Sequence, residues 1–177
     1  MEKQVTKAME IMFRQHEGQK RKFTNEPYAE HPIRVRENAL RLFEQVYPNY
    51  HDSIDQTVAS LRAQSILSIV AYLHDVEEDT DMNLDSLVEE VFGDFYLRAY
   101  ELEEYQEIKN ALILLNRGNY KNYFEYIKAI KEDFYARLVK LADLQDNMSD
   151  LKEGSMKDKY RFARAYLEEG LYKEKIK

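Results

Sequence analysis

Turn-forming residues are scarce in this chain. Only 5 glycines and 3 prolines interrupt its 177 residues. That is too few for the many turns of an all-β fold, and segments that alternate apolar and polar residues are hard to find. The sequence therefore predicts an all-α protein. We expect one compact domain over residues 1–177 with about seven or eight helices, because no repeat, low-complexity tract or linker divides the chain.

Apolar residues that recur every three to four positions mark the expected helices. The third helix contains the almost wholly apolar segment 65–73, which is typical of a central, buried helix. A capping box, Ser155 to Asp158, is expected to begin the last one. The expected helices cover 3–15, Pro32 to Pro48 with proline at the first position, Asp52 or Ser53 onward, 84–93 after a cap at Asn83 or Asp85, roughly 94–115, about 120–131, 133–151 and about 155–169.

Composition narrows the function classes. With 26 Lys+Arg, 33 Asp+Glu and no cysteine, the net charge is −7. A disulfide scaffold and a thiolate-bound metal are excluded, so any metal must bind histidine and carboxylate. The acidic excess argues against general nucleic-acid binding. No apolar run approaches the ~20 residues of a membrane span, and the N-terminus lacks the apolar stretch of a signal peptide. We therefore expect a cytoplasmic protein without nucleic-acid or membrane partners, and leave homo-oligomerisation open.

The apolar segment 65–73 ends directly in His74-Asp75, and more acids follow. Polar groups at the edge of a core are costly unless they are paired or bind a metal. Acids at a helix C-terminus also oppose the helix dipole, so a divalent cation would stabilise them. A solvated acidic helix end is the alternative. His51-Asp52 is the same dipeptide in a polar turn, where we expect an N-cap and a surface histidine.

Two further residues extend this set. His31 lies at the start of the second helix, and Asp143 lies in the most apolar part of its helix. Each has a structural alternative, because His31 could bond helix-start amides and Asp143 could pair with Lys140. Together with His74 and Asp75 they form a set of imidazoles and carboxylates that suits manganese, iron or zinc. Open positions on such an ion could hold water and a phosphate oxygen.

Three consecutive cations, Lys20-Arg21-Lys22, come shortly before His31. Such a run is usually a solvated loop. In an otherwise acidic chain its local field could instead attract a polyphosphate. We expect the preceding His16 to be a structural histidine that bonds the backbone of this loop.

Four segments carry a family resemblance: HEGQKRKFTNEPYAEHPIRV (16–35), YLHDVEEDT (72–80), VFG (91–93) and VKLADLQDN (139–147). In order and spacing they resemble the His-Asp (HD) hydrolase domain of the RelA/SpoT stringent-response proteins. They are most similar to its stand-alone small alarmone hydrolase form, the metazoan SpoT homologue type. The resemblance covers roughly residues 4–170 and implies an all-helical HD-domain bundle. We expect no synthetase or regulatory domain in the remaining length.

The resemblance implies a manganese-dependent enzyme that removes pyrophosphate from the 3′ position of guanosine tetra- or pentaphosphate. It also implies residue roles. His31, His74, Asp75 and Asp143 would hold one ion, for which other divalent metals are alternatives; Glu78 and Asp79 would be the catalytic acids; Arg21, Lys22 and Asn147 would bind substrate. In a continuous helix, each acid would share a face with the ligand four residues before it.

Two positions depart from the family pattern. Leu144 stands where a basic residue is usual, and Leu114-Leu115-Asn116 followed by Arg117 replaces a Leu-Thr-Lys segment. Both fall where we expect base or phosphate contacts, so we count Arg117 among the substrate-binding residues. Tyr160 is another, because it could stack on a base, although core packing is the commoner role of a tyrosine.

The departures leave other functions open. One is an HD-type phosphohydrolase that acts on another phosphorylated nucleotide, such as NADPH or a different alarmone. A non-catalytic alarmone-binding module is another. A plain helical scaffold would require four metal-type residues and two acids to match the motif by accident.

Overall fold

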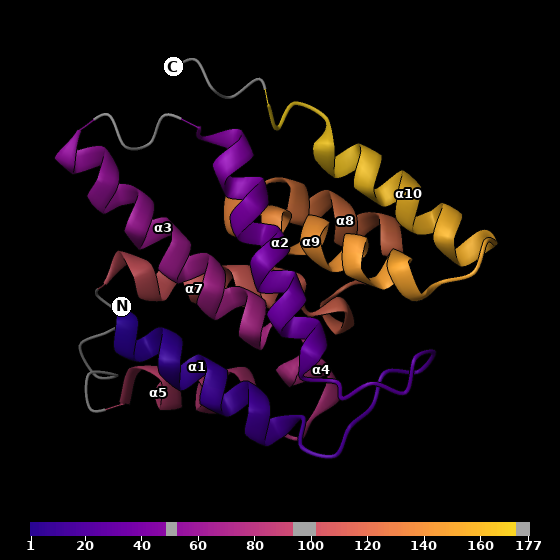
Figure 1. The fold of residues 1–177 in the computed structure, drawn as a ribbon, viewed down its shortest axis with the longest axis horizontal. Helices are drawn as coiled ribbons and strands as arrows, with labels where there is room; N and C mark the ends of the chain where they lie inside the picture. Colours follow the sequence, from indigo (N-terminus) through magenta and orange to yellow (C-terminus); the bar gives the residue numbers. More distant parts are fainter. Residues whose placement is uncertain (49–52, 94–101, 173–177) are drawn as a thin grey trace.

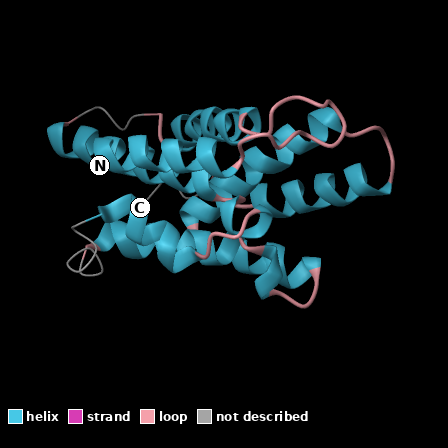
Figure 2. Cartoon of the chain, turned by 90° about the horizontal axis from the view of Figure 1, so that it is seen from below, coloured by secondary structure: helices cyan, strands magenta, loops and turns pink. Residues whose placement is uncertain are grey.

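The structure, a computed structural model, describes residues 1–48, 53–93 and 102–172. Within these ranges the chain forms helices and no strand (Figure 2), which confirms the all-α prediction. Eight of the described helices have nine residues or more, and α4 has four. The helices are α1 (Glu2–Gln15), α2 (Glu30–Val46), α3 (Ile54–Leu73), α4 (Val76–Asp79), α5 (Leu84–Phe92), α7 (Glu103–Leu115), α8 (Tyr123–Lys131), α9 (Phe134–Asp150) and α10 (Ser155–Glu168), with a 3-10 turn at Arg117–Asn119.

Several helix starts are those that the sequence predicts. The side chain of Ser53 accepts a hydrogen bond from the amide of Gln56, and Asn83 caps α5 in the same way. Gly93 follows α5 with a φ of 56°, a backbone conformation that favours glycine. The prediction for His51-Asp52 and the first part of the expected helix 94–115 lie outside the described residues.

One predicted start and one predicted cap are wrong. Helix α2 begins at Glu30, so Pro32 is its third residue rather than its first. Proline is tolerated there because amides of the first turn have no partner within the helix. The expected capping box of α10 does not form. Gly154 occupies the cap position with a φ of 154°, and Ser155 is already helical.

The C-terminal half of α3, which contains the apolar segment 65–73, lies at the centre of the molecule (Figure 1), as that segment predicts. Helix α3 packs against α1, α2, α7 and α9, and α2 also packs against α9. The side chains of Ile66, Leu67 and Ile69 on α3 are completely buried. This packing brings α2, α9 and the C-terminal end of α3 to one place, beside α4 and the loop between α1 and α2 (Figure 1). No helix in the described ranges is both long and apolar enough to cross a lipid bilayer.

An ion pair joins α1 to α5, and it gives a test of this arrangement. Arg14 donates two hydrogen bonds, of 2.8 and 2.6 Å, to the carboxylate of Glu90. These bonds lower the pKa of Glu90. The stabilisation is therefore fully present above the ordinary glutamate pKa and is lost as the pH falls through the lower pKa of the folded state.

We expect Arg14→Gln to lower the free energy of unfolding at pH 7 by at most about 1 kcal/mol. The difference from the wild type should disappear in acid, where Glu90 is protonated in both proteins. Urea unfolding over a pH series measures this. Arg164→Gln, which breaks the pair between Arg164 and Glu168 within α10, is the control and should cost only about 0.3–0.5 kcal/mol. A deficit for Arg14→Gln that persists unchanged in acid would contradict the expected role of this pair.

Candidate active site

His74 directly follows α3 and is buried. Its Nδ1 lies 2.8 Å from the carbonyl oxygen of Ala71. A carbonyl only accepts, so Nδ1 is the donor, and a neutral ring then carries its lone pair on Nε2. This Nε2 is buried without a hydrogen-bond partner among the described residues, and it lies 3.1 Å from Oδ2 of Asp75. The ring thus directs a free acceptor toward a carboxylate.

His31, in the first turn of α2, presents its own Nε2 to the same space. Its Nδ1 lies 2.6 Å from Oδ2 of Asp146. Its Nε2 lies 3.4 Å from Oδ2 of Asp75 and 3.2 Å from Oδ1 of Asp143. A carboxylate that holds one ring nitrogen while the other faces a ligand set is the arrangement by which proteins orient metal-binding histidines.

Asp143, on α9, is the fourth member of the cluster. Its Oδ1 lies 3.8 Å from Nε2 of His74, and its Oδ2 accepts a 2.6 Å hydrogen bond from Lys140. The sequence left open whether Asp143 pairs with Lys140 or faces the histidines, and it does both. Three residues offer ligand atoms that all lie within 4.8 Å of one another: His31, His74 and Asp75.

This donor set fits a divalent cation. A buried nitrogen that faces carboxylates and has no partner is costly unless a positive charge lies between them. Burial alone would raise the pKa of Asp75, but the carboxylates raise the pKa of both His74 and His31, and the protonated rings hold the pKa of Asp75 well below its usual range; a bound metal ion would take the place of those protons. The carboxylate is therefore ionised, as a metal ligand must be. Imidazole and carboxylate together suit manganese, iron or zinc.

Two residues that support the ligands were not predicted. The hydroxyl of Tyr28 donates a 2.6 Å hydrogen bond to Oδ2 of Asp75. Asp146 holds His31 and also accepts a 2.6 Å hydrogen bond from Arg34. A signal for Asp146 was available, because a residue three positions after Asp143 lies on the same face of a helix.

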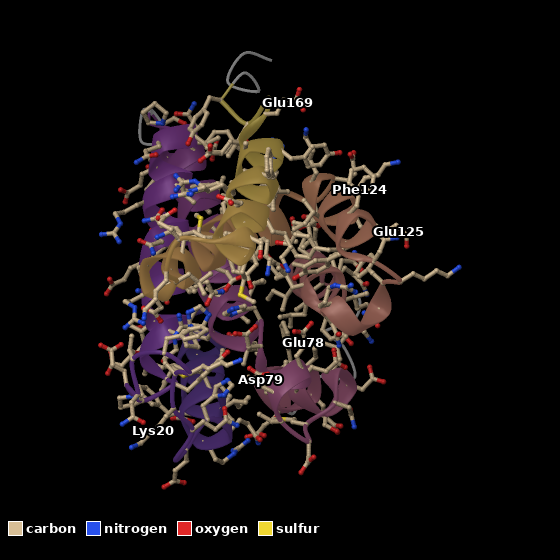
Figure 3. The ribbon with its side chains drawn as sticks, turned by 90° about the vertical axis from the view of Figure 1, so that its right-hand side faces the viewer. Lys20, Glu78, Asp79, Phe124, Glu125 and Glu169 are labelled. Atoms are coloured by element: carbon tan, nitrogen blue, oxygen red, sulfur yellow. The ribbon has the colours of Figure 1, made fainter. Side chains whose placement is uncertain are left out.

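The two acids of the predicted catalytic pair lie on α4. The predicted continuous helix is interrupted, because α3 ends at Leu73 and α4 begins at Val76. The amide of Asp79 still bonds the carbonyl of Asp75 at 2.9 Å, so a helical turn carries the acids past the ligand. Glu78 accepts a hydrogen bond from the backbone amide of Arg117. Both acids are exposed and lie near each other (Figure 3).

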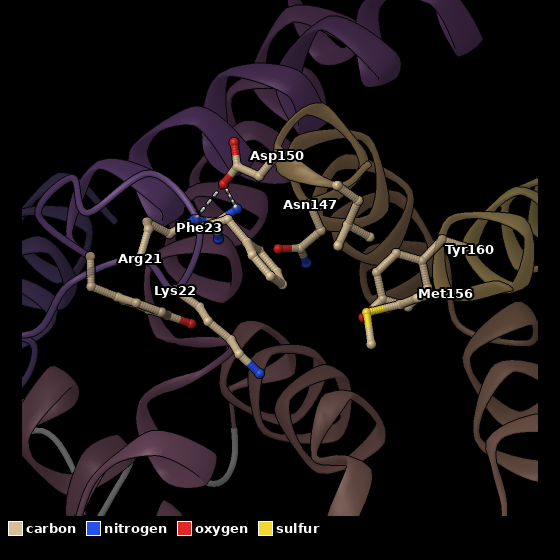
Figure 4. Close-up of a pocket in the computed structure, with 9 residues that line it drawn as sticks. Arg21, Lys22, Phe23, Asn147, Asp150, Met156 and Tyr160 are labelled. Atoms are coloured by element: carbon tan, nitrogen blue, oxygen red, sulfur yellow. Dashed lines mark hydrogen bonds and ion pairs between the residues drawn. The ribbon is translucent and has the colours of Figure 1, made fainter. Parts of the chain in front are cut away.

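Most of the predicted site residues line one cleft of about 320 Å³. These are His31, Asp75, Glu78, Asp79, Arg117, Asp143, Asn147 and Tyr160, with His74 buried behind them. An adjoining hollow of about 200 Å³ shares Tyr28, Asn147 and Tyr160 with the cleft. Its other walls include Arg21, Lys22, Phe23 and Met156 (Figure 4).

The basic run does not act as one cluster. Arg21 is buried and donates two hydrogen bonds, of 3.0 and 2.7 Å, to Oδ2 of Asp150 (Figure 4). Lys20 and Lys22 are exposed, and only Lys22 lines the hollow. Sequence patterns cannot show which of three adjacent cations turns inward to a carboxylate 129 positions away.

Two smaller expectations are also corrected. Leu144 is completely buried in the core, so its position does not contact a ligand in the cleft. His16 is buried, as expected for a structural histidine, but its Nδ1 bonds the side chain of Gln19 at 2.8 Å rather than the loop backbone. Its ring packs on Tyr28, with the ring centroids 4.6 Å apart.

Comparison with known proteins points to one family. The chain is 34% identical over 148 residues to guanosine-3′,5′-bis(diphosphate) 3′-pyrophosphohydrolase of Aquifex aeolicus (strain VF5), a match that covers 84% of this chain and 18% of the relative. It is 28% identical over 165 residues to a protein of Oryza sativa subsp. japonica named putative GTP diphosphokinase RSH1, chloroplastic, covering 90% of this chain and 16% of the relative. The chain is a homologue of the RelA/SpoT-type hydrolases. It spans less than a fifth of the length of these relatives, and no family model matches it.

Asp146 gives a test of how this cluster is held. Asp146→Asn leaves His31 and Arg34 with a neutral partner, so we expect the free energy of unfolding at pH 7 to fall by about 1–3 kcal/mol. Thermal or urea unfolding of the metal-free protein measures this. Asp158→Asn also removes one charge, but its side chain is 56% exposed, and it should change stability by less than about 0.5 kcal/mol. Equal effects of the two substitutions would contradict the supporting role of Asp146.

Proposed function

We propose that this chain is a metal-dependent (p)ppGpp 3′-pyrophosphohydrolase, built as one HD-type phosphohydrolase domain over residues 1–177. The observation that carries the proposal is the convergence of His31, His74, Asp75 and Asp143 beside two exposed acids in one cleft. Its relative in Aquifex aeolicus bears the name of this activity. The ion would be manganese, for which other divalent metals are alternatives.

Each group in the cleft has a role in this proposal. His31, His74, Asp75 and Asp143 would hold the ion. When bound, a divalent ion lowers the pKa of a coordinated water and polarises a phosphoryl oxygen. The side chain of Glu78 is exposed, but the protein atoms around it remove part of its water, and this partial desolvation raises its pKa above the ordinary value. The pKa of Glu78 thereby comes closer to the range in which a general base works at neutral pH. Glu78 or Asp79 would accept the proton of the attacking water.

The reaction balances with these groups. The water oxygen forms a bond to the phosphorus that is attached to the ribose O3′, and the bond between that phosphorus and O3′ breaks. The proton taken by the carboxylate passes to O3′, which leaves as a hydroxyl group. The products are GDP or GTP and pyrophosphate.

The hollow beside the cleft would take the nucleoside. Phe23, Met156 and Tyr160 give it apolar and aromatic walls, and Lys22 and Asn147 supply polar groups. Arg21 lines it, but its guanidinium already pairs with Asp150, so we assign it to holding the loop rather than to a direct phosphate contact. In the cleft, Arg117 would contact phosphate.

The direct test incubates the purified chain with manganese and ppGpp. We expect GDP and pyrophosphate in equal amounts, and loss of both after the metal is removed with a chelator. Chromatography of the nucleotides and a phosphate assay measure the products. No hydrolysis by protein with bound manganese would overturn the proposal.

Substitutions distinguish the role of the two acids from the role of the metal ligands. Glu78→Gln and Asp79→Asn should lower kcat by about 10²-fold or more while manganese still binds. Asp75→Ala should abolish both activity and manganese binding. Calorimetric titration with manganese and kinetic assays measure the two properties.

Glu77 provides a matched control on α4. Its carboxylate bonds the amide of Leu84 at 3.1 Å and the side chain of Asn116 at 2.7 Å, and it does not line the cleft. Glu77→Gln should therefore affect stability more than kcat. A loss of kcat in this variant as large as in Glu78→Gln would contradict the assignment of the acids.

A different phosphorylated nucleotide, such as NADPH, is the alternative substrate. Two departures from the family pattern favour this alternative. The departure at Leu144 supports it less, because Leu144 lies in the core. The departure at Arg117 still supports it, because Arg117 lines the cleft. A panel of nucleotides decides between them. Preference for ppGpp by orders of magnitude would exclude the alternative.

A further inference from the structure

One wall of the cleft includes two residues that have no role in the reaction as proposed so far. It is formed by α8 and α10, which contribute Tyr123 and Lys159. Neither residue lines the adjoining hollow. Tyr123 and Lys159 therefore face the cleft and not the expected nucleoside position, and Tyr160, which lines both spaces, lies between.

Lys159 is the first unusual feature of this wall. Its Nζ lies 4.4 Å from the ring centroid of Tyr123 and 5.2 Å from that of Tyr160. Within the described part of the chain it has no hydrogen bond or ion pair. Of the other cations of the cleft, Lys140 bonds the carboxylate of Asp143, whereas the guanidinium of Arg117 donates to the carbonyl of Tyr120 and keeps its charge. A cation whose charge is not neutralised attracts an anion into the cleft.

The hydroxyl of Tyr123 is the second unusual feature of this wall. It is buried and has no hydrogen-bond partner among the described residues. Burial raises the pKa of Tyr123 to about 12, so the hydroxyl keeps its proton at neutral pH and is able to donate. A buried donor without a partner costs about 1–3 kcal/mol. A bound ligand or water that accepts from it removes this cost.

The direction of the substrate connects the two observations. The reacting phosphorus must lie next to Glu78 and the ligand set, and the nucleoside extends into the hollow. The second phosphate of the 3′ diphosphate then stays in the cleft, which Tyr123 and Lys159 also line.

We propose that Lys159 and the hydroxyl of Tyr123 bind the pyrophosphate that the reaction releases, at a subsite separate from that of the nucleoside. This inference rests on the proposed function. It assigns Tyr123 and Lys159 to recognition of the released pyrophosphate.

The test measures binding of the two products separately. Inorganic pyrophosphate and GDP are titrated into the whole chain at a fixed free manganese concentration. Lys159→Met keeps the length of the side chain and removes its charge, so we expect it to weaken pyrophosphate binding about tenfold and to leave GDP binding unchanged. Tyr123→Phe keeps the ring and should weaken pyrophosphate binding about threefold.

Two matched variants serve as controls. Lys157→Met removes a charge from the same helix outside the cleft and should change neither affinity. Lys22→Met, in the hollow, should weaken GDP binding and leave pyrophosphate binding unchanged. Unchanged pyrophosphate affinity in Lys159→Met, or equal weakening of both products, would overturn the subsite. Hydrolysis of ppGpp by the wild type is assayed separately, and its absence would overturn the proposed function instead.

Discussion

Two buried imidazoles that face one buried and one partly buried carboxylate, Asp143 and Asp75, set the main physical constraint on this protein. Neither His31 nor His74 is free to turn away, because Asp146 holds one ring at Nδ1 and the carbonyl of Ala71 holds the other. Their Nε2 atoms must then point into the same space. The packing of α2, α3 and α9 is what brings these rings together. A cation in that space satisfies all of these groups at once, which no neutral side chain would do.

The residues around the ligand set orient it. Tyr28 bonds Asp75, while Lys140 and Asn147 bond the two oxygens of Asp143. Each of these two carboxylates is therefore held by at least one donor, which would limit its rotation before a metal binds. The cleft beside it contains exposed acids, which can accept a proton from water, and lysines, which can bind phosphate.

The sequence predicts the fold class and the members of the cluster better than their orientation. An apolar helix that ends in His74-Asp75 brings polar groups to the edge of a core, and that pattern is visible in one segment. The role of Asp146 depends on which face of α9 meets α2, and the inward turn of Arg21 depends on a carboxylate far away in sequence. Local patterns contain neither relation. Ser155 is a smaller example of what a local pattern does not show. The motif predicts Ser155 as the N-cap of α10, but Gly154 is the N-cap.

The central claim is that His31, His74, Asp75 and Asp143 bind one divalent ion that serves the chemistry of the cleft. Anomalous diffraction from crystals of the protein grown with manganese tests this most directly. We expect a single strong anomalous peak within bonding distance of the two histidine Nε2 atoms and of carboxylate oxygens from Asp75 and Asp143. A cluster without a peak, or a peak bound only by Glu78 and Asp79, would contradict it.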